Sequence, residues 1–193
     1  MGEHSDILRV HDGAYLAAVQ AVLPSQGRAY LDADTAVSPG SGEAALRAVG
    51  AVTAAVDAVA GGRADNAEPA RAMGFCLFNN VAIGALRARD VFGAARVAVI
   101  DFDVHHGNGT EAAFRRDATL FYASTHQYPH YPGSGAAQDT GVGNILNLPL
   151  AAGDGSQAFR QAFTDHLLPA LDDFEPGFVL VSAGFDALSE DPL

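Results

Sequence analysis

The chain has no lysine, a single cysteine and no long uncharged apolar run. All 11 basic residues are arginines, and against 23 acidic residues they leave a formal net charge of −12 over 193 residues. A chain with so little positive charge is poorly suited to replace the counterions of a nucleic acid, so DNA and RNA are not expected partners. The negative charge would attract a cationic ligand without indicating which one.

The single cysteine, Cys76, excludes an internal disulfide and suits a reducing compartment. No segment reaches the roughly 18 uncharged apolar residues that a membrane-spanning helix needs. The first residues, Met1 to Asp6, carry acidic side chains and lack the basic start of a secretory signal peptide. We therefore expect a cytoplasmic protein without a membrane contact.

Hydrophobic residues make up 49% of the chain, enough for a sizeable core, and the length favours one domain over 1–193. Candidate helices and strands alternate, which is typical of an α/β fold with a parallel sheet. Helices are predicted where apolar residues recur every three or four positions, and strands where short runs are mostly apolar. The predicted helices cover 41–60, 80–89, 110–114 and 156–174, and the predicted strands cover 96–103, 119–124 and 178–182.

Two of the predicted strands lead into acidic side chains. The first is followed by Asp103 and His105, two residues apart, and the last is followed by Asp186. In an open α/β sheet, ligands gather beyond the carboxyl ends of the strands, so these side chains should share one crevice. Two carboxylates and one imidazole can hold zinc and leave a coordination position for water, as a metal-dependent hydrolase requires.

Each of these residues also has an ordinary structural interpretation. An aspartate after a strand is often a turn former or a helix cap, and a lone histidine is often a hydrogen-bonded structural residue. Neighbouring side chains in an extended run face opposite ways, so His106 should point away from His105. Cys76 is expected to be a small buried apolar residue rather than a nucleophile. Convergence of several strand ends favours the metal hypothesis over these alternatives.

Several motifs in one order closely resemble the histone deacetylase family. They are Met73 to Asn80, Asp101 to Gly109, Tyr131 to Gly135 and Ser182 to Asp186. The resemblance is to the bacterial, class II-like branch, which includes acetylpolyamine amidohydrolases and proteins of acetoin utilisation. It implies an arginase/deacetylase-like α/β fold, with a mostly parallel sheet flanked by helices. It also implies a zinc-dependent hydrolase acting on acetyl-lysine or acetylpolyamine.

The resemblance also implies roles for individual residues. Asp103, His105 and Asp186 would bind the zinc ion. Asp101, Ser124 and Thr125, with the backbone of Asp103 and His105, would bind a structural potassium ion. Gly74 and Phe75 would line one wall of a substrate tunnel, and Tyr131 would line the opposite wall. Zinc would polarise the amide carbonyl and lower the pKa of its bound water toward about 7. Fe²⁺ is an alternative ion, because an Asp–His–Asp set suits several divalent metals.

The chain departs from the family in two places. The family's paired histidines, its general base and electrostatic partner, have no counterpart between Gly62 and Arg71. The chain also stops at Leu193, before the loop that carries the family's catalytic tyrosine, so the fold is expected to be incomplete relative to the family. No catalytic residue is therefore assigned. Acid–base catalysis is worth about 10²–10⁴-fold, so these losses would leave a weak catalyst.

Three functions remain open. The first is a zinc-dependent deacetylase, and the second is a non-catalytic metal-binding protein that has lost its base and tyrosine. The third is an arginase-like ureohydrolase, which would need two metals and further ligands near Asp103 and Asp186. The first ranks highest for the family origin of the chain, and the second ranks above it for the activity of these 193 residues. The acyl group, its carrier and a homo-oligomeric state are left open.

Overall fold

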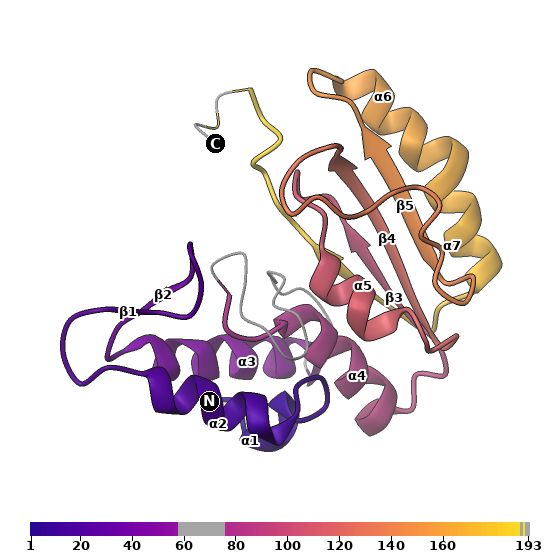
Figure 1. The fold of residues 1–193 in the computed structure, drawn as a ribbon. Coiled ribbons are helices and arrows are strands. Elements are labelled where there is room, and N and C mark those ends of the chain that lie inside the picture. The colour runs from indigo at the N-terminus through magenta and orange to yellow at the C-terminus, as the bar shows by residue number, and fades with distance from the viewer. Residues whose placement is uncertain (58–75, 190, 192–193) are drawn as a thin grey trace.

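The computed structural model describes residues 1–57, 76–189 and 191. Its helices are α1 (His4–Ile7), α2 (Gly13–Val22), α3 (Ser41–Asp57), α4 (Asn80–Phe92), α5 (Asn108–Phe114), α6 (Ser156–Gln161), the π-helical segment η1 (Ala162–Leu167) and α7 (Leu168–Phe174). Its strands are β1 (Ala29–Tyr30), β2 (Ala36–Val37), β3 (Val97–Asp101), β4 (Leu120–Gln127), β5 (Ile145–Leu150) and β6 (Phe178–Ser182). Figure 1 shows an N-terminal helical part beside a sheet with its own helices.

Four strands form one parallel sheet in the order β5–β4–β3–β6. The chain runs outward from β3 through β4 to β5, and then returns so that β6 pairs with the other side of β3. The register places Asp101, the last residue of β3, between Ser124 of β4 and Ser182 of β6. The strand order reverses at β3, which is where ligands bind in open α/β sheets.

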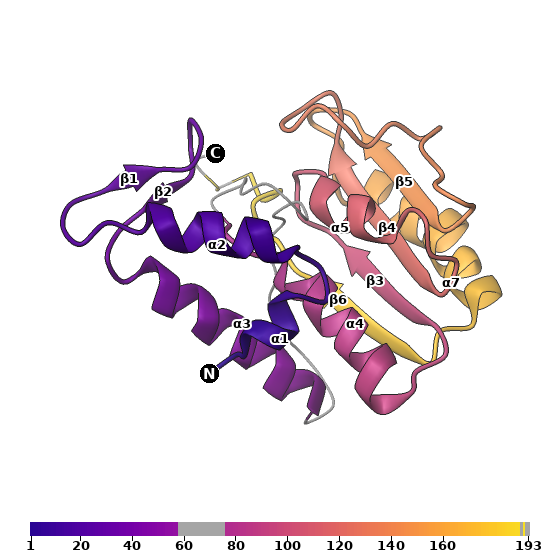
Figure 2. The same cartoon turned by 60° about the horizontal axis from the view of Figure 1, so that its bottom comes forward.

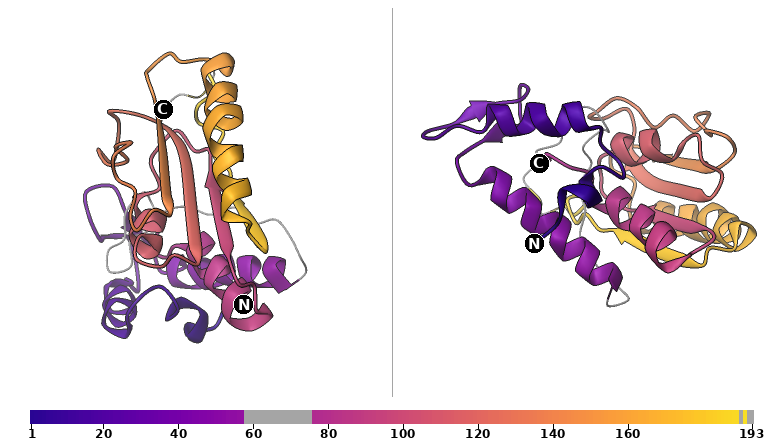
Figure 3. Two further views of the ribbon diagram at one scale, coloured as in Figure 1. Left: turned by 90° about the vertical axis from the view of Figure 1, so that its right-hand side faces the viewer. Right: turned by 90° about the horizontal axis from the view of Figure 1, so that it is seen from below.

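Helices cover both faces of this sheet. The helix from α6 to α7 lies along one face (Figure 3, left), where Leu167 packs on Ala98, Ile100, Phe121 and Ala123. Helices α4 and α5 pack on the opposite face. All of β3 is buried, as expected for a parallel strand covered on both faces. The predicted α/β class with a parallel sheet is therefore confirmed.

A second core joins the N-terminal helices to α4. It contains Ile7, Leu16, Val19, Val49 and Ile83, and the helices that carry them lie beside the sheet in Figure 2. The predicted apolar face of α3 is buried as expected, whereas the predicted helix end at Val59 to Gly62 lies outside the described residues. Helices α1 and α2 were not predicted from the sequence.

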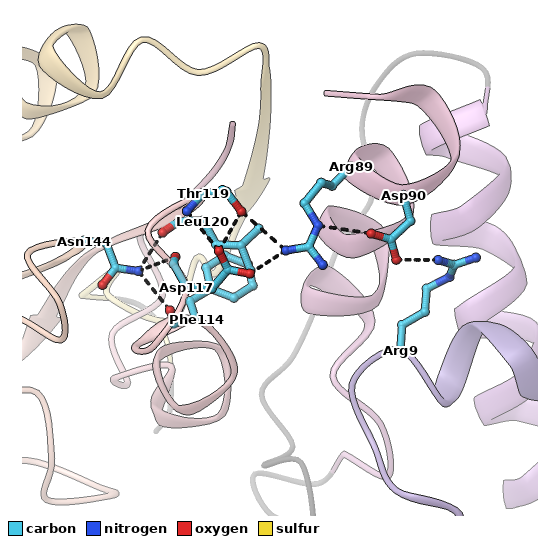
Figure 4. Close-up of polar contacts among 8 residues, drawn as sticks. All are labelled: Arg9, Arg89, Asp90, Phe114, Asp117, Thr119, Leu120 and Asn144. Atoms are coloured by element: carbon cyan, nitrogen blue, oxygen red, sulfur yellow. Dashed lines mark hydrogen bonds and ion pairs between the residues drawn. The ribbon is translucent and has the colours of Figure 1, made fainter. Parts of the chain in front are cut away.

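Polar contacts join α4 to the amino-terminal edge of the sheet (Figure 4). The guanidinium of Arg89 lies 2.5 Å from Asp117 and 3.0 Å from Asp90, which also pairs with Arg9 at 2.7 Å. The buried amide of Asn144 donates to the carbonyls of Phe114, Asp117 and Leu120. These bonds hold the edge opposite to the one where the candidate ligands lie.

Strands β1, β2 and β5 and the last helix also differ from the sequence prediction. Strand β5 was not predicted; it contains Pro149, which argues against a central strand but is tolerated at the edge position that β5 occupies. The predicted helix over 156–174 is present, but it contains the π-helical segment η1, and Pro169 lies in the first turn of α7. Across residues 1–57, 76–189 and 191, no helix has the length and apolar content to span a bilayer.

Candidate metal centre

The three predicted metal ligands come together at the carboxyl edge of the sheet. Asp103 and His105 follow β3, and Asp186 follows β6, its neighbour. One ligand atom from each residue lies within 4.8 Å of the other two, so a single ion could contact all three. The Nδ1 atom of His105 is 3.1 Å from Asp103 Oδ1 and 3.0 Å from Asp186 Oδ2.

The backbone fixes the two carboxylates. The amide of Val104 donates to Asp186 Oδ1 at 3.0 Å, and the amide of His105 donates to Asp103 Oδ1 at 2.8 Å. Gly184 allows the loop after β6 to pass against Asp103, because a Cβ at this position would lie 2.6 Å from Asp103 Cγ. These contacts orient both carboxylates toward the imidazole.

Contacts within the site shift the pKa values of His105 and Asp103. The hydrogen bond to Asp103, reinforced by the charges of Asp103 and Asp186, outweighs burial and raises the pKa of His105. Burial raises the pKa of Asp103, but its hydrogen bonds with His105 outweigh this effect and hold that pKa below its usual value. The raised pKa favours the protonated form of His105 beside the two carboxylates in the metal-free protein. A divalent cation could balance the same two carboxylates, so the donor set fits such an ion.

We expect Gly184→Ala to weaken zinc binding by displacing Asp103. The new Cβ would lie 2.6 Å from Cγ and 2.7 Å from the backbone Cα of Asp103, so the carboxylate and the segment that carries it must move. Displacing a ligand in this way should cost about 10–100-fold in zinc affinity, the range typical of a lost supporting contact. Competition with a chromogenic chelator measures the affinity, and circular dichroism checks the fold. Gly40→Ala, where no atom lies within 4 Å of the new Cβ, is the matched control. An unchanged affinity in Gly184→Ala would contradict this account.

Behind the candidate metal group lies a fully buried carboxylate, Asp101. Its Oδ1 accepts from the amide of Asp103 at 3.2 Å, and its Oδ2 accepts from the Tyr122 hydroxyl at 3.1 Å. Burial raises the pKa of Asp101 to about 7. Nearby on β4, Ser124 and Thr125 are buried, and Thr125 Oγ1 has no hydrogen-bond partner within the described part of the chain. A fully buried carboxylate fits a bound cation, which would compensate the cost of burying its charge.

Of the residues expected to line a substrate tunnel, Gly74 and Phe75 lie outside the described residues. Tyr131 is exposed, and its ring stands edge-on to the ring of His105 with centroids 6.2 Å apart. A cavity of about 480 Å³ reaches the candidate metal group at Asp103, and its other lining residues include Thr125, His126, Gln127, Phe159 and Leu188.

Sequence reasoning missed a buried polar network beside the site. His106 points away from His105, as predicted, with Nδ1 2.9 Å from Ser134 Oγ and Nε2 3.1 Å from Glu111 Oε2. The amide of Asn147 also donates to Glu111, at 2.8 Å. Burial raises the pKa of Glu111, but the bonds from His106 and Asn147 leave it below its usual value. These contacts could not be predicted because the partners are far apart in the sequence. Ser134 reaches His106, and Asn147 reaches Glu111, only when β4 and β5 are paired.

A parallel α/β sheet with two carboxylates and an imidazole beyond adjacent strand ends is the arrangement of the arginase and deacetylase class of folds. A family model described as the histone deacetylase domain matches residues 2–193. The chain belongs to the histone deacetylase family.

Relatives of this chain carry consistent names. A histone deacetylase-like amidohydrolase of Pseudomonas aeruginosa is 43% identical and covers 97% of the chain, and a chloroplastic histone deacetylase 10 of rice, Oryza sativa, is 49% identical over 66% of it. The chain spans 53% and 30% of these two proteins.

Solved structures show the same fold. A crystal structure of the HDA15 HD domain matches all of the chain with a TM-score of 0.93 at 33% identity, over 59% of its own length. An acetylpolyamine aminohydrolase from Burkholderia pseudomallei matches 98% of the chain with a TM-score of 0.85 at 29% identity, over 68% of its own length. The predicted arginase/deacetylase-like fold is therefore confirmed.

Proposed function

We propose that this chain forms a zinc-dependent deacetylase site that hydrolyses the acetyl amide of acetyl-lysine or acetylpolyamine. The observation that carries the proposal is the convergence of Asp103, His105 and Asp186 within 4.8 Å at the carboxyl edge of the sheet. Family membership and the likeness to an acetylpolyamine aminohydrolase support the reaction class.

In this proposal Asp103, His105 and Asp186 hold the zinc ion, with Fe²⁺ as the alternative. The bound ion would polarise the amide carbonyl and activate a water molecule. His105 must be neutral to bind, so its proton has to leave when the ion arrives. Tyr131 stands beside His105 and would border the acyl chain, opposite Gly74 and Phe75. Asp101, Ser124 and Thr125, with the backbone of Asp103 and His105, would hold a structural potassium ion.

A non-catalytic metal-binding protein is the second candidate. The observation in its favour is the absence of paired histidines between Gly62 and Arg71, where the family's general base lies. An arginase-like ureohydrolase is less well supported. It needs two divalent metals, and within residues 1–57, 76–189 and 191 only one group of three or more His, Cys, Asp or Glu side chains could hold a metal ion.

The first and second candidates differ in turnover. Purified protein loaded with zinc is assayed for release of acetate from an acetyl-lysine peptide and from acetylputrescine, beside Asp103→Asn. Zinc-dependent turnover that Asp103→Asn abolishes supports the deacetylase. Zinc binding without turnover in a folded protein supports the metal-binding candidate, and absence of zinc binding contradicts both.

The setting of the proposed reaction follows from the sequence. Cys76 is the single cysteine of the chain and is half-buried rather than fully buried as predicted. A single cysteine, which excludes an internal disulfide, suits a reducing compartment, so we place the protein in the cytoplasm. The proposed partner is an acetylated amine, in line with a net charge that favours cationic carriers.

A further inference from the structure

Two rings of one loop contact the candidate ligand His105. His130, in the loop between β4 and β5, stacks on His105 with ring centroids 5.0 Å apart and an interplanar angle of 24°. Tyr131, the next residue, meets the same imidazole edge-on at 76°. His130 is exposed at the surface, whereas His105 is only 28% exposed. The outer ring therefore covers one face of the candidate ligand.

The loop that carries these rings is anchored from inside. The hydroxyl of Ser134 is 2.9 Å from His106 Nδ1, and the carbonyl of Gly135 is 2.9 Å from His126 Nε2. Gly135 has a φ of +91°, and a Cβ here would lie 2.7 Å from the ring of His106. The chain can pass this close to both imidazoles only as glycine. Because these anchors are buried, the rings at the tip of the loop are held at a defined place.

His130 could be a further metal ligand or a residue that orients His105, and the geometry distinguishes these two roles. A further metal ligand would bring a nitrogen atom to the shared position, but His130 is not among the described residues whose ligand atoms group within 4.8 Å. Its ring lies almost flat on His105 instead. Flat stacking resists rotation of the His105 ring about its last side-chain bond, and that rotation decides where Nδ1 points. Partners that orient a metal-binding histidine are a major determinant of affinity.

We propose that His130 is a positioning residue whose ring, together with Tyr131, clamps His105 in the orientation that presents Nδ1 to the metal. The inference rests on the proposed metal site. It predicts that an aromatic ring is needed at position 130, and that the imidazole nitrogens are not. The variants His130→Ala and His130→Phe separate these two properties. His166→Ala, an exposed histidine of η1, is the matched control.

The test measures zinc affinity and the visible absorption of the Co²⁺-loaded protein. We expect His130→Ala to weaken zinc binding about 3–10-fold, the range of an aromatic pair, and to change the cobalt spectrum. His130→Phe and His166→Ala should keep the wild-type values. A wild-type result for His130→Ala overturns the proposal, and so does an equal loss in His130→Phe, which would show that a nitrogen is required.

A second measurement tests the contact between His130 and His105 independently of the proposed function. In the metal-free protein, the ring protons of His105 are followed by NMR. Loss of the stacked ring in His130→Ala should move them downfield, and His130→Phe should restore them. If the wild-type protein binds no metal, the proposed function fails, while this shift still decides the clamp: its presence supports the clamp and its absence overturns it.

Discussion

Asp186→Asn is expected to abolish the stabilisation of the protein by zinc while leaving the metal-free fold intact. Asparagine keeps the oxygen that accepts the Val104 amide, so the loop after β6 retains its anchor. It removes one of two carboxylates that share the candidate ion with His105. We expect zinc affinity to fall by more than about 100-fold, beyond the loss of an outer supporting contact.

Thermal unfolding with and without zinc measures this effect. Zinc at about 100 times its Kd should stabilise the wild type by about 2.7 kcal/mol and leave Asp186→Asn unchanged. Asp173→Asn, an exposed position on α7, is the matched control for charge removal. Stabilisation of Asp186→Asn equal to that of the wild type would contradict the proposed site.

Protons should compete with zinc at His105. The hydrogen bond with Asp103, and then the charges of Asp103 and Asp186, raise the pKa of this imidazole. A raised pKa means that the metal-free site holds its proton to higher pH than an ordinary histidine. Zinc affinity should therefore fall as the pH is lowered through neutrality, and a chelator competition series at several pH values measures this. A flat series would contradict the coupling between His105 and the two carboxylates.

The sequence predicted the edge of the sheet where the candidate site lies. Apolar runs that end in Asp103 and precede Asp186 mark two parallel strands, and parallel strands end at one edge. It did not predict β5, because Pro149 contradicts a strand until its edge position is known. Nor did it predict the contact of His130 with His105. This stacking depends on the conformation of the loop after β4, which neither the spacing nor the types of its residues predict.

The second large effect concerns Asp101. Its pKa is about 7 in the folded protein, against an ordinary value of 3.8, because the carboxylate is fully buried. The folded state therefore binds a proton that the unfolded chain releases, and this favours folding at low pH. The contribution is lost as the pH rises from about 4 to about 7, and three pKa units correspond to about 4 kcal/mol. Asp101→Asn should abolish this loss.

His126 acts in the opposite direction. Burial, and then the nearby His106, lower its pKa to about 4, so it makes the protein less stable as the pH falls from about 6.5 to about 4. The two effects partly cancel in the wild type. The comparison of wild type with Asp101→Asn at each pH removes the contribution of His126, which both proteins share. Urea unfolding from about pH 4 to about pH 8 in metal-free tetramethylammonium buffer measures the difference.

The response to potassium tests whether the buried Asp101 carboxylate belongs to a cation site. If the carboxylate belongs to a cation site, replacing tetramethylammonium with potassium at pH 8 should stabilise the wild type and leave Asp101→Asn unchanged. Equal responses of the two proteins to potassium would exclude a cation at Asp101. A wild-type minus variant difference that does not change with pH would show that the folded protein does not raise the pKa of Asp101.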